Sequence, residues 1–157
     1  MPSNIFAKLS DIKGESGDAK HKDEIEVLSF SWGVTLAAPA GPGVGAGKPT
    51  FQDLAFVHHV DKASPSLMRA CATGTHLKDA TITQRKAGKG QHDYLIVKMS
   101  DVIITGVIDT TSSTQPSTES VSLTFGKVHY EYRPQKADGS LDAPVLFKYD
   151  LKTNKEG

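Results

Sequence analysis

Apolar residues recur at every second position in several separate segments of this 157-residue chain. Successive side chains of a β-strand point to opposite faces, so this alternation predicts strands with one covered face. The segments with this pattern are residues 4–9, 24–36, 51–60, 80–85, 92–99, 102–109, 121–132 and 145–151. About eight strands joined by turns rich in Gly, Asp and Ser indicate a mainly β fold, either a barrel or a sandwich.

Two of the predicted strands change phase part of the way along. Near the start of segment 24–36, the apolar positions shift between Val27 and Leu28, which one bulge residue would explain. In segment 121–132 the shift falls at Gly126 and Lys127. After the first shift, the predicted core face consists of Leu28, Phe30, Trp32, Val34 and Leu36. Because barrels use bulges to bend strands, we expect a curved and closed antiparallel barrel of two sheets.

One short helix, at about residues 64–73, is predicted beside the barrel. Ser64 is a suitable N-cap, Pro65 suits the first helical position, and Gly74 provides a C-terminal stop. A small apolar stripe, formed by Leu67, Met68, Ala70 and Cys71, would lie against the barrel.

Composition limits the classes of partner. The 18 basic and 18 acidic residues give no net charge, which provides no electrostatic footprint for nucleic acid or anionic lipid. We find no apolar segment long enough to cross a membrane and no secretory leader, so we expect synthesis in the cytoplasm, no membrane insertion and, if export occurs, a specialised route. A single cysteine allows no internal disulfide. The length suits one domain over residues 1–157.

A loop rich in Gly, Pro and Ala covers residues 37–49. It fails as a phosphate-binding loop, because Pro42 takes the place of the first glycine and Pro49 takes that of the Mg²⁺-binding hydroxyl. Two interpretations stay open, a mobile surface loop or an arm that becomes ordered on contact with another subunit.

Side chains that could carry catalysis are few. His58 and His59 are adjacent on a predicted strand, so they point to opposite faces and cannot both bind one ion; we expect a strand-end pair near solvent. Cys71 is predicted to be a small buried hydrophobic residue. The acidic residues around Gly14 lack the spacing of a Ca²⁺ loop. We therefore predict no enzyme activity, no metal site and no cofactor.

A series of short motifs in a specific order extends over nearly the whole chain. They are Asp11-Ile12-Lys13-Gly14-Glu15-Ser16, Ser29-Phe30-Ser31-Trp32-Gly33, the glycine-rich loop ending at Lys48, Phe51-Gln52-Asp53-Leu54, Asp61-Lys62-Ala63-Ser64-Pro65, Arg85-Lys86-Ala87-Gly88 and Tyr132-Arg133-Pro134-Gln135-Lys136-Ala137-Asp138-Gly139. With these motifs the chain resembles the hemolysin-coregulated protein (Hcp) family, the tube subunits of bacterial type VI secretion systems.

The resemblance implies a β-barrel with one flanking helix that forms a homohexameric ring, and rings that stack into a tube. It also implies a contractile sheath outside the tube, a spike (VgrG-type) protein at its tip, and small secreted effectors carried in the lumen. Such a protein would leave the cytoplasm through the type VI machine without a signal peptide.

Specific residues are expected to perform these roles. Ser29, Ser31 and Gly33 lie opposite the predicted core face and are the candidates for lumen and effector contact. The candidates for the inter-subunit or inter-ring loop are Gly41, Gly43, Val44, Gly45, Gly47 and Lys48. Lys86, Lys89 and Gly90 belong to a turn expected at a ring face, where the flexible tail 152–157 is a second candidate. The rival functions are a monomeric barrel that binds a small molecule and a metal-dependent hydrolase that uses His58 or His59.

Overall fold

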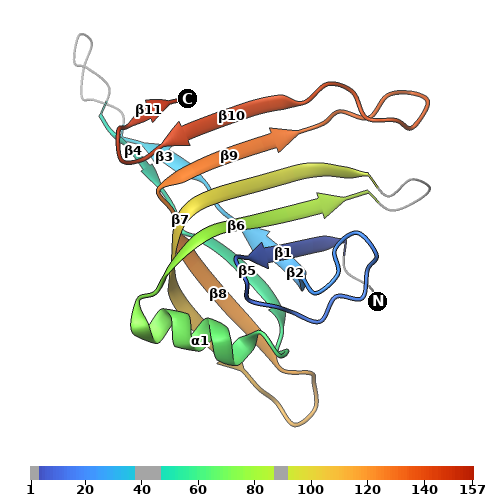
Figure 1. Cartoon of the computed structure of the whole chain (residues 1–157), viewed down its shortest axis with the longest axis vertical. Helices are drawn as coiled ribbons and strands as arrows, with labels where there is room; N and C mark the ends of the chain where they lie inside the picture. Colours follow the sequence, from blue (N-terminus) through green and yellow to red (C-terminus); the bar gives the residue numbers. More distant parts are fainter. Residues whose placement is uncertain (1–3, 38–46, 87–91) are drawn as a thin grey trace.

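A computed structural model describes residues 4–37, 47–86 and 92–157 of the chain. These residues form eleven strands and one α-helix (Figure 1). In chain order the elements are β1 (Ile5–Leu9), β2 (Ile25–Ser31), β3 (Val34–Leu36), β4 (Pro49–Phe51), β5 (Leu54–His59), α1 (Ser64–Thr73), β6 (His76–Arg85), β7 (Asp93–Thr110), β8 (Thr118–Thr124), β9 (Lys127–Tyr132), β10 (Val145–Asp150) and β11 (Lys155–Glu156).

Six strands close into an antiparallel barrel in the order β7-β6-β1-β2-β5-β8, and β8 returns to pair with β7. The sheet continues past the barrel, because β9 pairs with the first half of β7 and is followed by β10 and β11. A separate small sheet contains β3 and β4. The predicted class, a mainly β closed barrel with one flanking helix, is confirmed (Figure 1).

The bulge predicted near Val27 and Leu28 is present in β2. Val27 is opposite His58 on β5, whereas Ser29 is opposite Val57, so the register shifts between them. The predicted core face beyond the bulge was only partly right. Phe30 and Trp32 pack against the core, but Leu28, Val34 and Leu36 are 48%, 49% and 53% exposed. Leu28 belongs to the bulge, and the other two lie on the small β3–β4 sheet, outside the barrel.

Segments 92–99 and 102–109, predicted as two strands, form the single strand β7. Asp101 interrupts the alternation with a φ of 61°, in the left-handed region that Asp tolerates better than most residues. Opposite it, the Gly126 N–H donates to the carbonyls of Ser100 and Asp101 at 2.9 and 3.1 Å. The predicted phase shift at Gly126 and Lys127 is confirmed, since β8 ends and β9 begins there along the same edge of β7.

The barrel interior is filled by side chains from every strand of the closed ring. Its largest fully buried apolar members are Leu9, Ile25, Leu54, Phe56, Ile82, Met99, Ile104 and Leu123. Interdigitated aliphatic and aromatic groups of this kind fill the barrel interior among the described residues.

Helix α1 packs against β7 and supplies buried Leu67 and Ala70 to the core. The C-terminal stop is confirmed, because Gly74 adopts a left-handed conformation with φ of 62°. The N-cap is Ala63 and not Ser64, which lies inside the helix and accepts a 3.1 Å hydrogen bond from the Asp61 N–H. Met68, predicted to face the barrel, is 43% exposed.

Candidate interaction surfaces

The outer face of β2, β5, β8 and the second half of β7 carries a row of small residues. Ser31 is paired with Ala55, Ala55 with Ser122, and Ser122 with Gly106. Ser31 is exposed and the others are half-buried. None of the four has a side chain larger than serine, so this part of the wall is smooth and weakly polar.

The next row on the same face is Ser29, Val57, Ser120 and Ile108. Ser29 is exposed, as a lumen-contact candidate must be. Gly33 lies beyond the end of β2, where its carbonyl accepts a 2.8 Å hydrogen bond from the Gln52 N–H. The structure therefore brings Ser29 and Ser31 together on one wall and places Gly33 at its margin.

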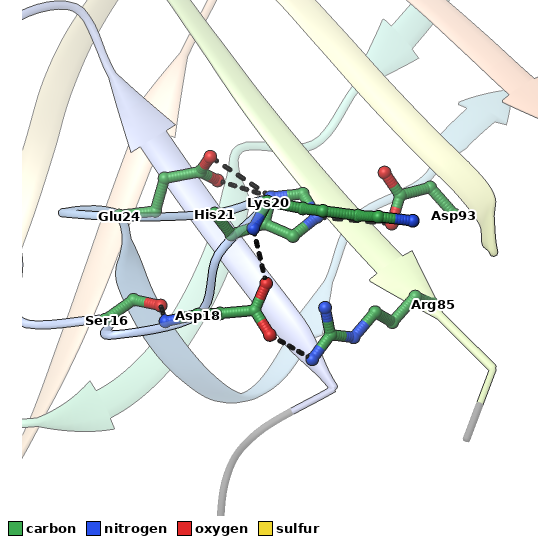
Figure 2. Close-up of polar contacts among 7 residues, drawn as sticks. All are labelled: Ser16, Asp18, Lys20, His21, Glu24, Arg85 and Asp93. Atoms are coloured by element: carbon green, nitrogen blue, oxygen red, sulfur yellow. Dashed lines mark hydrogen bonds and ion pairs between the residues drawn. The ribbon is translucent and has the colours of Figure 1, made fainter. Parts of the chain in front are cut away.

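A polar cluster fixes the segment between β1 and β2 against the outside of the barrel (Figure 2). Arg85 Nη2 is 2.5 Å from Asp18 Oδ2. His21 Nδ1 is 3.1 Å from both carboxylate oxygens of Glu24, and its Nε2 is 3.2 Å from Asp93 Oδ1. The hydrogen bond from Arg85 lowers the pKa of Asp18 to about 2, against the opposing effect of burial. We call this group the clasp.

The clasp explains why Phe6, on the outer face of the barrel, is buried. The His21 ring stacks on Phe6 with centroids 4.4 Å apart, and the Arg85 guanidinium lies 4.9 Å from the Phe6 ring centroid. Phe6 is 1% exposed. The alternation around Phe6 placed it outside the core, but a sequence pattern does not show that a segment 12 to 15 residues later covers it.

The turn expected at a ring face begins directly after the clasp. Lys86 closes the β6–β7 hairpin by donating its N–H to the His92 carbonyl at 3.0 Å. Its Nζ is 3.1 Å from Gln135 Oε1 and 5.2 Å from the Tyr94 ring centroid. Lys86 thus connects the hairpin to the segment after β9. The other two candidates, Lys89 and Gly90, lie outside the described residues.

The small β3–β4 sheet supports both ends of the glycine-rich loop. Val34 is opposite Phe51, and Leu36 is opposite Pro49. Phe51 packs against Tyr149 and Phe125, with ring centroids 5.0 and 6.3 Å apart. Gly47 and Lys48 are exposed beside β4. The remaining loop candidates lie outside the described residues; they are Gly41, Gly43, Val44 and Gly45.

His58 is a buried polar residue, contrary to the expectation of a histidine pair near solvent. Its side chain is fully buried and its Nε2 is 2.8 Å from Oε1 of Glu119, which is also fully buried. His59 is exposed, so the two imidazoles do point to opposite faces as predicted. Glu119 was missed. The sequence signal that could have found it is its position: Glu119 is two residues before Val121 and four before Leu123, so it lies on the same core face of the strand.

Within residues 4–37, 47–86 and 92–157, no group of three or more His, Cys, Asp or Glu side chains could hold a metal ion. Cys71 is half-buried at the edge of the core. The helix in these ranges is too short and too polar to cross a membrane.

Comparison with known proteins adds a consistent result. Residues 6–132 match the family model described as "Type VI secretion system effector, Hcp". The chain is 42% identical to "Protein hcp1" of Pseudomonas aeruginosa over 159 aligned positions that cover 98% of each chain. It is similar to the crystal structure of Hcp1 from Salmonella typhimurium, with 36% identity, a TM-score of 0.80 and full coverage of both chains. A structure described as a type six secretion system protein has a TM-score of 0.90 at 26% identity, with 98% of each chain covered.

Proposed function

This chain belongs to the Hcp family of type VI secretion system proteins, and on that premise we propose that it is the structural subunit of a secretion tube. Six copies would form a ring, and rings would stack into a tube that sheath contraction expels together with a spike protein at the tip. Small effectors would travel in the lumen. The protein would act by its architecture and not as an enzyme.

The observation that carries the proposal is the smooth wall on β2, β5, β8 and the second half of β7. Its central row, from Ser31 to Gly106, consists of four small residues in register. A wall of this kind suits a wet lumen that must let varied cargo pass. Because the barrel itself is packed, cargo would need a channel between subunits and not within one.

The outer strands support self-assembly. β11 pairs with β10 only at Tyr149 and Asp150. Val145 and Leu146, on the earlier part of β10, are 63% and 49% exposed. An extended strand edge with exposed apolar residues favours association with another chain. When such contacts repeat around a closed ring, assembly ends once the ring is complete. We assign the unplaced loop residues Gly41, Gly43, Val44 and Gly45 to contacts between subunits or rings, together with Gly47 and Lys48.

The first experiment is the solution mass by light scattering after size exclusion, over a range of protein concentrations. A species near six times the 16.8 kDa chain mass supports the proposal. A strict monomer at all concentrations contradicts it and returns the monomeric ligand-binding barrel as the leading alternative. That alternative has little support in the subunit, because core side chains fill the barrel interior.

The assignment of the wall to cargo contact has a separate experiment. Ser31→Gln should leave ring size unchanged and alter which effectors are retained. Ser112→Gln, an exposed serine in the segment between β7 and β8, is the matched control. If both variants retain the same effectors as the parent protein, Ser31 has no part in cargo binding.

The glycine-rich loop is assessed by deleting residues 41–47. This deletion should weaken ring stacking and secretion while the barrel stays folded, because Phe51 on β4 keeps its contacts with Phe125 and Tyr149. Unchanged secretion would remove the loop from the mechanism. Lys86→Gln examines the ring-face assignment of Lys86, Lys89 and Gly90 in the same secretion assay.

A further inference from the structure

Five residues form one continuous row across the sheet that contains β1, β6, β7, β9 and β10. Lys8 is opposite Thr81, and Thr81 is opposite Lys98. Lys98 is opposite His129, which is opposite Lys148. The row alternates lysine with a smaller or less basic side chain, and we call it the basic row. These strands lie side by side in Figure 1.

All five side chains project from the outer face of the sheet. The residues that flank Lys8 and Lys98 in sequence are fully or almost fully buried, and so are those that flank Thr81. Phe147 and Tyr149, which flank Lys148 in the sequence, pack against the core. Because the pleat alternates faces, the basic row lies on the outside, and its three lysines are exposed.

The three lysines make no ion pair with any residue of the described ranges. Other cations on the same part of the sheet do have acidic partners. Lys127 Nζ is 3.8 Å from Asp150 Oδ2, and Lys152 contacts Asp101. The charge of the basic row is therefore available to a second molecule, although the whole chain has no net charge.

Acidic side chains border the basic row on both sides. The adjacent row on one side contains Asp79 and Asp150, and the row on the other contains Glu131. Glu131 Oε1 is 3.6 Å from His129 Nε2. Lys127 and Arg133, the cations beside the basic row, are paired with Asp150 and Glu131, so the unpaired positive charge forms one narrow line. A broad polyanion such as nucleic acid would place phosphates against these carboxylates, and like charges in proximity are unfavourable.

The spacing indicates the form of that line. Neighbouring strands are about 4.8 Å apart, so lysines two strands apart are separated by roughly 10 Å. Acidic residues seven positions apart on an α-helix are about 10.5 Å apart along the axis and lie on nearly the same face. The row also borders two shallow hollows of about 510 and 280 Å³, which share Lys98.

We infer that the basic row is a docking site for an acidic helix of another protein, one that lies across the strands with carboxylates at i, i+7 and i+14 facing Lys8, Lys98 and Lys148. Thr81 and His129 would face the intervening turns of that helix. This inference goes beyond the proposed tube function and does not depend on it, because a single subunit contains the whole row.

The experiment uses the full chain and two synthetic helical peptides of identical composition, labelled for fluorescence anisotropy. One peptide carries Glu at i, i+7 and i+14; the other carries its three Glu residues at i, i+5 and i+10, which distributes them around the helix. We expect the first peptide to bind at least ten-fold more tightly and its affinity to fall as salt is added.

Matched protein variants locate the binding. The triple variant Lys8→Gln, Lys98→Gln, Lys148→Gln should lose at least ten-fold in affinity for the first peptide. The control Lys20→Gln, Lys62→Gln, Lys136→Gln removes three exposed lysines that lie outside the basic row and should bind like the parent protein. Circular dichroism checks that both variants are folded, and solution mass compares their self-association with that of the parent protein.

Several outcomes overturn the inference. Equal affinity for the two peptides would exclude the helical spacing, and equal losses in the two triple variants would exclude the row as the site. Tighter binding of an oligothymidine of similar charge would assign the surface to nucleic acid. Loss of self-association in the first triple variant alone would assign it to a second copy of this chain.

Discussion

His58 Nε2 and Glu119 Oε1 are 2.8 Å apart between β5 and β8, and neither side chain is exposed. On the other side of the imidazole, Nδ1 is 3.7 Å from Asp61 Oδ2. Burial opposes the charged imidazole, but the nearby Asp61 carboxylate and the hydrogen bond to Glu119 outweigh it and raise the pKa of His58. Burial also raises the pKa of the Glu119 carboxyl, helped by Asp109 and opposed by His58.

This pair should make the folded state less stable as pH rises. The stabilising contribution of His58 is complete below its unfolded pKa of about 6.5 and is lost as pH rises through the higher folded pKa. The raised pKa of Glu119 acts in the same direction from about pH 4.3 upward. In urea unfolding from pH 5 to 9, the double variant His58→Gln, Glu119→Gln should have a flatter stability profile than the parent protein.

His59→Gln is the control, because His59 is the exposed neighbour of His58. It should retain the slope of the parent protein. The same slope for the parent protein and the double variant would show that the buried pair does not titrate in this range.

The clasp should have the opposite dependence on pH. Because Arg85 lowers the pKa of Asp18 to about 2, the Asp18 contribution is present above about pH 3.9 and is lost as pH falls toward 2. At neutral pH, Asp18→Asn should speed amide hydrogen exchange at position 18 and at His21. It should also reduce the loss of folding stability between pH 4 and 2. Asp11→Asn, at an exposed position without an ion pair in the described ranges, should do neither. Unchanged exchange in Asp18→Asn would show that the clasp does not hold the segment.

Gly14 should tolerate no larger residue. A Cβ there would lie 2.6 Å from the Glu24 carbonyl oxygen and 2.7 Å from the Ile25 Cα, and backbone atoms cannot rotate away. Overpacking of this kind costs about 1–3 kcal/mol or more, and Gly14→Ala should lower the free energy of unfolding by that amount. Gly17→Ala is the control, since no atom lies within 4 Å of its Cβ position. Equal unfolding midpoints in urea for the two variants would contradict the close approach.

Helix α1 offers a pair of adjacent residues with opposite environments. Leu67 is fully buried, whereas Met68 is 43% exposed. Leu67→Ala should destabilise the protein by about 2–5 kcal/mol, because it removes buried apolar volume and leaves a cavity. Met68→Ala should change stability by less than about 1 kcal/mol. Thermal or urea unfolding measures both, and a larger loss for Met68→Ala would mean that a partner or a second copy covers the outer side of α1.

Much of the fold could be predicted because period-two alternation is a local property. The strands, the bulge after Val27, the phase shift at Gly126 and the helix stop at Gly74 each depend on a few neighbouring residues. The errors arose where tertiary context decides. Asp101 joins two predicted strands into one by adopting a left-handed conformation, and its partner Gly126 is 25 positions away.

The surfaces are less accessible to sequence reasoning. The phase of β2 placed Ser29 and Ser31 on the outside, but the alignment of Ser31 with Ser122 and Gly106 required the register of three more strands. The clasp and the basic row also join residues from distant parts of the chain. A net charge of zero concealed the row, because a sum over the chain contains no information about position.

The sequence alone therefore determined the class of fold, the covered face of most strands and the family to which the chain belongs. Alternation follows from the backbone geometry of a strand. The order of the motifs can be read along the chain without knowing where each motif lies in the fold. Only the tertiary structure decided that Glu119 faces His58, that Asp18 holds Arg85, and that Lys8, Lys98 and Lys148 form one row. Those contacts depend on strand register and barrel closure, which are set jointly by the whole chain.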